Sequence, residues 1–228
     1  MKFGSYDPEG FANPADMGIF YTVAFNSWAL EASGSFKLTT SSGESREATF
    51  GEGSYQTGNF EIEPGFPFFY VPNTFFRNIV NSFSKNRITL AGAEFLEDRI
   101  KFNTRCFDVN PGVSLDLRFK MVTHDGKDKE FFFDITELLV DGLTFGEENT
   151  CYLGVFKNTN AQYPATTYAG ILFLKKYYTF YDMSGLDNDN FILDQRLRVG
   201  VGLRNLNNYI LDKQYDRFFN GYAPNLYD

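Results

Sequence analysis

The stretch FEIEPGFPFFYVPNTFFRNIVNSF, residues 60–83, decides the fold. Apolar and acidic residues alternate over residues 60–63, which is typical of a strand with one buried face. Pro64-Gly65-Phe66-Pro67 breaks this strand, and an aromatic run then continues to Pro72. Beyond Pro72, apolar residues recur with helical spacing at Phe75, Phe76, Ile79, Val80 and Phe83. The stretch therefore predicts a strand, a tight turn, a second strand and an amphipathic helix.

This order of elements resembles the catalytic stretch of the C-terminal lobe of pepsin-like aspartic proteases. In that family a strand leads into Asp-Thr-Gly-Thr-Ser, and apolar residues, a proline and a helix follow. When the family's glycine is placed on Gly65, its proline falls on Pro72 and its catalytic Asp falls on Glu63. The resemblance implies that Glu63, Pro64, Gly65 and Phe66 occupy a degenerate catalytic motif.

The motif lacks groups that the family's chemistry needs. Two carboxylates, one from each lobe, share a proton and polarise a water molecule. Glu63 has one extra methylene, which moves its carboxylate by about 1.5 Å, a displacement that costs roughly 100-fold in rate. Pro64 brings neither a hydroxyl nor a backbone N–H, and Phe66 replaces a residue with a hydroxyl. The sequence thus predicts no catalytic residue and a pseudo-protease rather than an enzyme.

A second segment, YAGILFLKKYYTFYD at residues 168–182, resembles the family's Ile-Leu-Gly-Asp-x-Phe-Leu-Arg-x-Tyr-Tyr segment. There a glycine turn crosses beneath the catalytic loop and leads into a helix and the last strands. Gly170 matches the family's glycine, and Ile171 stands where the family has an aspartate. Residues 3–7 resemble the start of the lobe and residues 198–202 its closing strand. The resemblance implies an all-β fold: a pepsin-like C-terminal lobe over residues 1–204, without its N-terminal lobe, and an extension over residues 205–228.

The resemblance also pairs the two cysteines. Cys106 and Cys151 match the positions of a bridged pair in the family, which implies a disulfide if the compartment is oxidising. Against such a compartment, the chain has many asparagines but no Asn-x-Ser/Thr sequon, and no segment of signal-peptide type follows Met1. Buried thiols therefore stay open as an alternative. An intracellular assembly is the favoured location, and a secretory or vacuolar one is the alternative.

Strand patterns recur outside the motif, with turn signals between them. We expect strands over residues 19–30, 33–38, 87–90, 99–102, 115–122 and 130–135, and a polar hairpin or loop over residues 39–52. Trp28 is expected to be a buried structural residue. The only histidine, His124, falls in a predicted hairpin turn, which argues against a catalytic triad.

Composition limits the partners and cofactors. The net charge of −8 and the pI near 4.8 argue against nucleic acid or an anionic membrane, and no apolar run approaches the ~20 residues of a membrane helix. Two cysteines and one histidine do not make a metal site, and the acidic run at residues 187–190 lacks the calcium-loop pattern. No metal or cofactor is expected.

The final residues, 205–228, are too apolar for a free tail, and a short helix is expected over residues 209–219. The residues predicted to bind partner proteins are Tyr209, Ile210, Tyr215, Phe218, Phe219 and Tyr222. The function predicted is a structural or docking subunit of a larger protein assembly. Two alternatives stay open: the C-terminal chain of a two-chain aspartic endopeptidase, and a module that binds peptides without cutting them.

Overall fold

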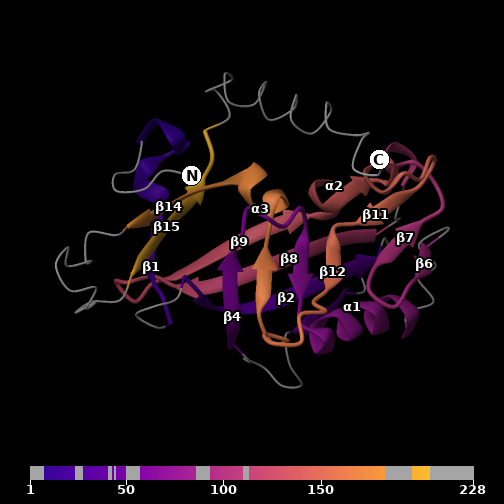
Figure 1. Cartoon of the computed structure of the whole chain (residues 1–228), viewed down its shortest axis with the longest axis horizontal. Coiled ribbons are helices and arrows are strands. Elements are labelled where there is room, and N and C mark those ends of the chain that lie inside the picture. The colour runs from indigo at the N-terminus through magenta and orange to yellow at the C-terminus, as the bar shows by residue number, and fades with distance from the viewer. Residues whose placement is uncertain are drawn as a thin grey trace.

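The computed structural model describes residues 8–23, 28–40, 43, 45–49, 57–85, 93–109, 113–182 and 197–205. Over these residues the fold is all-β, with three sheets and a few short helices (Figure 1). The strands are β1 (Gly18–Tyr21), β2 (Leu30–Thr40), β3 (Ser45–Thr49), β4 (Thr57–Ile62), β5 (Phe69–Val71), β6 (Ala93–Phe95), β7 (Ile100–Phe102), β8 (Val113–Val122), β9 (Asp128–Asp134), β10 (Leu139–Asp141), β11 (Cys151–Leu153), β12 (Val155–Lys157), β13 (Thr167–Ala169), β14 (Tyr177–Asp182) and β15 (Arg198–Leu203). The helices are α1 (Asn73–Lys85), α2 (Ile135–Leu138) and α3 (Ile171–Lys176), and the 3-10 turns are η1 (Pro8–Gly10), η2 (Pro14–Asp16), η3 (Cys106–Asp108) and η4 (Gly142–Phe145).

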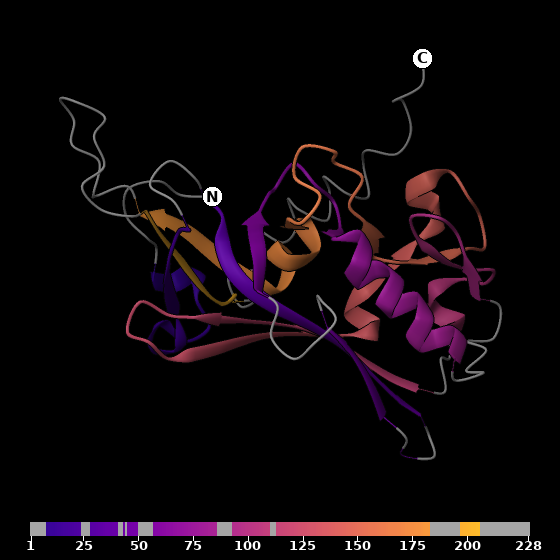
Figure 2. The same cartoon turned by 90° about the horizontal axis from the view of Figure 1, so that it is seen from below.

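The largest sheet has eight strands in the order β12-β5-β13-β4-β2-β8-β9, with β3 paired to β2. Its long strands β2, β8 and β9 form one twisted layer, and α1 and α3 lie on one side of it (Figure 2). The three-stranded sheet β1-β15-β14 lies near one end of this layer, and the four-stranded sheet β10-β11-β7-β6 lies near the other.

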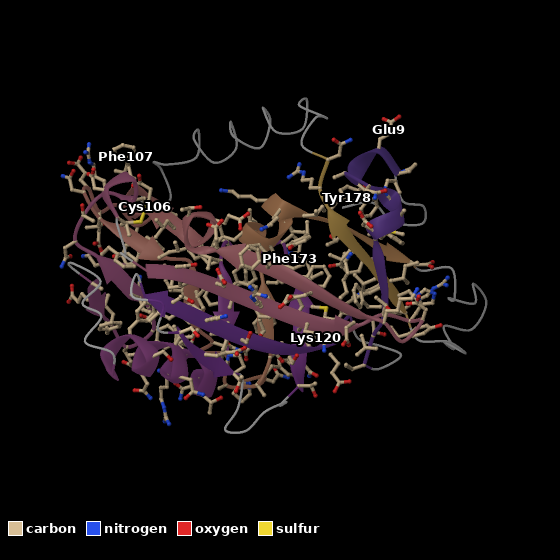
Figure 3. All side chains as sticks on the ribbon, turned by 180° about the vertical axis from the view of Figure 1, so that it is seen from behind. Glu9, Cys106, Phe107, Lys120, Phe173 and Tyr178 are labelled. Atoms are coloured by element: carbon tan, nitrogen blue, oxygen red, sulfur yellow. A yellow bond between two sulfur atoms is a disulfide. The ribbon has the colours of Figure 1, made fainter. Side chains whose placement is uncertain are left out.

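The core is filled by aromatic rings between the layers. Phe173 of α3 is fully buried near the centre of the molecule (Figure 3). Its ring centroid lies 5.7 Å from that of Phe60, 5.7 Å from that of Phe131 and 5.0 Å from that of Tyr177. Ring pairs at such distances add to the area term, so this cluster ties α3 and β14 to β4 and β9.

Several local predictions are confirmed. The helix after Pro72 forms as α1, with Phe75, Phe76, Ile79 and Phe83 buried. The polar stretch after residue 39 folds back as β3 on β2. The strands predicted over residues 99–102, 115–122 and 130–135 form as β7, β8 and β9, with a turn at His124. The segment at residues 87–90 lies outside the described residues.

The single strand predicted over residues 19–30 is wrong. β1 ends at Tyr21 and belongs to the three-stranded sheet, whereas β2 begins at Leu30 in the eight-stranded sheet. The chain turns between them, where the Val23 N–H donates to the Ala29 carbonyl at 2.8 Å. One straight strand cannot pair in two sheets, so the apolar run is divided. Trp28 lies at this turn, partly buried and edge-on to Tyr181 at 4.8 Å.

Candidate functional site

β4 and β5 follow each other in the chain but are not neighbours in the sheet. β13 lies between them, parallel to β4 and antiparallel to β5. The turn over residues 63–68 must therefore pass over the end of β13. This crossing places the predicted motif against the second matched segment.

The carboxylate of Glu63 stabilises its own turn. Its Oε1 accepts a hydrogen bond from the Gly65 N–H at 3.0 Å. The Glu63 backbone N–H donates to the Ala169 carbonyl at 3.0 Å, and its carbonyl accepts from the Phe66 N–H at 3.1 Å. Glu63 is thus fixed both to its own turn and to the end of β13.

Gly170 lies directly beneath this turn. Its N–H donates to the Phe68 carbonyl at 3.1 Å, and the Ile171 N–H donates to the Phe66 carbonyl at 2.8 Å. A Cβ at position 170 would overlap the Phe66 oxygen and would lie 2.6 Å from the Phe68 oxygen. Only a glycine fits at this close approach. The structure thus brings the turn over residues 63–68 against residues 169–171.

A row of side chains crosses the sheet beside the turn. Tyr168 pairs with Glu61 on β4 and with Tyr70 on β5, and Tyr70 pairs with Phe156 on β12. Paired residues point to the same face of a sheet. The Phe66 ring packs on this row, with its centroid 5.0 Å from those of Tyr70 and Tyr168.

Burial and like charge perturb the titration of this row. Burial, and then the charge of Glu63, raise the pKa of Glu61. Burial also raises the pKa of Tyr168, and the Glu61 charge acts in the same direction. The hydroxyl of Tyr168 accepts a hydrogen bond from Asn160 Nδ2 at 3.3 Å. The site therefore presents acidic groups beside aromatic rings.

The two cysteines lie away from the turn. Cys106 in η3 and Cys151 in β11 form a disulfide with their Cα atoms 4.9 Å apart. The bond fixes η3, and the neighbouring Phe107 is 94 % exposed at the edge of the molecule, opposite Glu9 and Tyr178 (Figure 3).

A groove of about 470 Å³ lies elsewhere on the described surface, lined by Phe20, Tyr21, Leu30, Glu31, Ser33, Thr57, Lys120, Val122 and Asp128. Its charged groups have polar partners within the groove. Lys120 pairs with Asp128 at 2.5 Å, and the Thr57 hydroxyl donates to Glu31 at 2.6 Å.

Several predicted features fall on residues that the structure does not describe. Tyr209, Ile210, Tyr215, Phe218, Phe219 and Tyr222, the acidic run at residues 187–190 and the helix expected over residues 209–219 lie outside the described residues. The last described residue, Asn205, donates from its N–H to the Gly10 carbonyl at 2.9 Å and from Nδ2 to the Glu9 carbonyl at 3.0 Å.

Within the described ranges, no group of three histidine, cysteine or acidic side chains is placed to hold a metal ion. In the same part of the chain, no helix is long and apolar enough to cross a membrane. His124 lies in the exposed β8–β9 turn, where its backbone N–H donates to the Ile19 carbonyl at 2.7 Å.

Sequence reasoning missed the acidic and aromatic row. The available signal is the alternation of Glu61 and Glu63 at the end of a strand, which predicts a half-buried strand and, for Glu63, the degenerate motif position, but no binding surface. Tyr168 and Tyr70 reach the same row through pairing between distant segments.

No protein-family model matches the chain, and no curated protein matches it either.

Proposed function

We propose that the chain is a catalytically inactive lobe of the pepsin-like aspartic protease type, which serves as a structural or docking subunit of a larger protein assembly. The observation that carries the proposal is the Glu63–Phe66 turn. It stands over a glycine crossing, as the resemblance implies, but offers Glu63, Pro64 and Phe66 in place of an aspartate and two hydroxyl residues.

The chemistry of the turn supports a non-catalytic role. Aspartic proteolysis needs two carboxylates that share one proton around a water molecule. The acid nearest to Glu63 in sequence, Glu61, is on the same strand, and its pKa is raised by burial and by Glu63. Ile171 adds an apolar side chain where the family has an aspartate. The turn therefore keeps a backbone arrangement without the polar groups that would activate water.

A peptidase assay tests the first half of the proposal. The purified chain is incubated with a denatured protein substrate at acid pH, with and without pepstatin. We expect no pepstatin-sensitive cleavage. Cleavage that Glu63→Gln abolishes would contradict the proposal and favour the two-chain endopeptidase.

Copurification tests the second half. The tagged full chain is expected to bring down other protein subunits at constant stoichiometry. The chain cut after Arg204 removes the apolar residues of the extension, whose burial is worth roughly 1.5–3 kcal/mol for each large side chain. The truncated chain should keep its far-UV circular dichroism and lose the copurifying subunits. Normal incorporation of the truncated chain would show that the extension is not the docking element.

A further inference from the structure

Glu61 and Glu63 form an acidic pair that no cation of the described residues neutralises in an ion pair. Glu61 lies in β4 and Glu63 directly follows it, and the Glu63 N–H still pairs with the Ala169 carbonyl of β13, so the two alternate positions share one face. Among the residues that the structure describes, neither carboxylate forms an ion pair, and the one hydrogen bond to them comes from the Gly65 N–H. Burial and the Glu63 charge raise the pKa of Glu61, so ionising both groups costs stability. A cationic group that binds to the two carboxylates would compensate their charge and offset this cost.

Two cations near this surface, Arg99 and Lys157, form ion pairs with other carboxylates. Arg99 is paired with Asp98 at 2.9 Å, and its guanidinium lies 5.7 Å from the Phe145 ring centroid. Lys157 at the end of β12 pairs with Glu97 at 3.1 Å. These two cations are therefore paired with other carboxylates, and neither of them compensates the charge of Glu61 or Glu63.

The aromatic side chains beside the pair add a second, independent feature. Phe66 and Tyr70 are partly exposed, whereas Tyr168 is only 6 % exposed and its hydroxyl accepts a hydrogen bond from Asn160. The Phe66 ring lies against both Tyr168 and Tyr70. Ring faces attract cations, and a planar guanidinium stacks on them while it binds a carboxylate through two N–H groups.

We propose that the acidic–aromatic surface, made of Glu61, Glu63, Phe66 and Tyr70, binds an arginine-bearing segment of a partner protein. This inference rests on the proposed docking function and names the chemistry of one contact. The net charge of −8 favours approach of a basic partner and disfavours a second copy of this chain. Arginine suits the surface better than lysine because its flat head offers both a stacking face and paired donors.

Fluorescence anisotropy with the full chain tests the inference. The probe is a fluorescein-labelled peptide, Gly-Ser-Arg-Gly-Arg-Ser-Gly, and the control peptide carries citrulline, which is neutral and of the same shape, in place of each arginine. We expect the arginine peptide to bind at low salt and the citrulline peptide to bind at least about tenfold more weakly, since charge-assisted hydrogen bonds are lost.

Matched variants separate the site from overall charge. Glu61→Gln/Glu63→Gln should weaken arginine-peptide binding at least about tenfold, whereas Glu94→Gln/Glu148→Gln, on exposed residues, changes the net charge equally and should keep binding within about twofold. Phe66→Leu keeps an apolar side chain without the ring and should weaken binding about threefold. The melting temperature of Glu61→Gln should equal or exceed that of the wild type, so that lost binding is not lost folding.

Three results would overturn the inference: equal binding of both peptides, equal losses in the two double variants, or no binding of the arginine peptide up to about 1 mM. A double variant that still enters the assembly normally would also overturn it, and would leave the docking function intact. A wild-type chain that copurifies with no subunit would instead refute the docking function itself.

Discussion

Replacing Gly170 with alanine tests how the Glu63–Phe66 turn is held on the segment beneath it. The new Cβ would overlap the Phe66 carbonyl oxygen and lie 2.6 Å from that of Phe68. Both are backbone atoms that accept hydrogen bonds from this segment, so the turn has to move. Overpacking costs about 1–3 kcal/mol, and weakening two hydrogen bonds adds about 0.5–1.5 kcal/mol each. We expect the free energy of unfolding to fall by about 3 kcal/mol.

Urea unfolding, followed by the fluorescence of Trp28, measures this change. With a slope of about 3 kcal/mol/M, the midpoint should fall by about 1 M. Gly65→Ala is the matched control, because its Cβ would lie 3.2 Å from Glu63 Oε1, the end of a flexible side chain. The control should stay within about 0.5 kcal/mol of the wild type. Equal midpoints for the two variants would refute the close approach at Gly170.

Reduction of the Cys106–Cys151 bond should lower the free energy of unfolding by about 4 kcal/mol, because the bond closes a loop with a sequence separation of 45; unchanged urea midpoints with dithiothreitol would contradict this. Asp134→Ala should cost about 1 kcal/mol in thermal unfolding, because the Asp134 carboxylate caps α2. Burial raises the pKa of Asp134, but the hydrogen bonds that its carboxylate accepts lower this pKa by more, so the folded-state pKa lies below the ordinary value. The stability that Asp134 contributes should therefore be present above about pH 4 and vanish as the pH falls through the lowered folded-state pKa. Burial raises the pKa of Tyr177 to about 12, so stability should fall as the pH rises from about 10 toward that value, and Tyr177→Phe should flatten this alkaline loss.

The features predicted best from the sequence are encoded locally. The period of Phe75, Ile79 and Phe83 after Pro72 specifies α1 without reference to any other part of the chain. The break at Pro64-Gly65 is local too, since proline and glycine act on their own backbone angles. The disulfide is implied by the resemblance alone, because the spacing of two cysteines does not show whether they are oxidised.

The features that were missed depend on pairing between distant segments. The apolar run at residues 19–30 satisfies the local pattern of one long strand, but β1 finds its partner in β15 and β2 finds its partners in β4 and β8. The position of Tyr168 beside Glu61 is likewise set by the register of β13 on β4. A shift of one residue would turn that tyrosine to the other face. No local pattern around residue 168 carries this register.

The hydrogen bonds that hold the Glu63–Phe66 turn show which of its positions are constrained. The bonds that fix it to the crossing segment run from the Glu63 N–H to the Ala169 carbonyl, from the Gly170 N–H to the Phe68 carbonyl, and from the Ile171 N–H to the Phe66 carbonyl. All three join backbone atoms, so they do not depend on side-chain hydroxyls. Position 64 donates none of them, and a proline, which lacks the N–H, is therefore tolerated there. The constraint that remains is steric and falls on position 170, where a side chain would collide with the turn. The side chains of residues 63–66 can therefore change without loss of these three backbone bonds, whereas Gly170 cannot change without a collision.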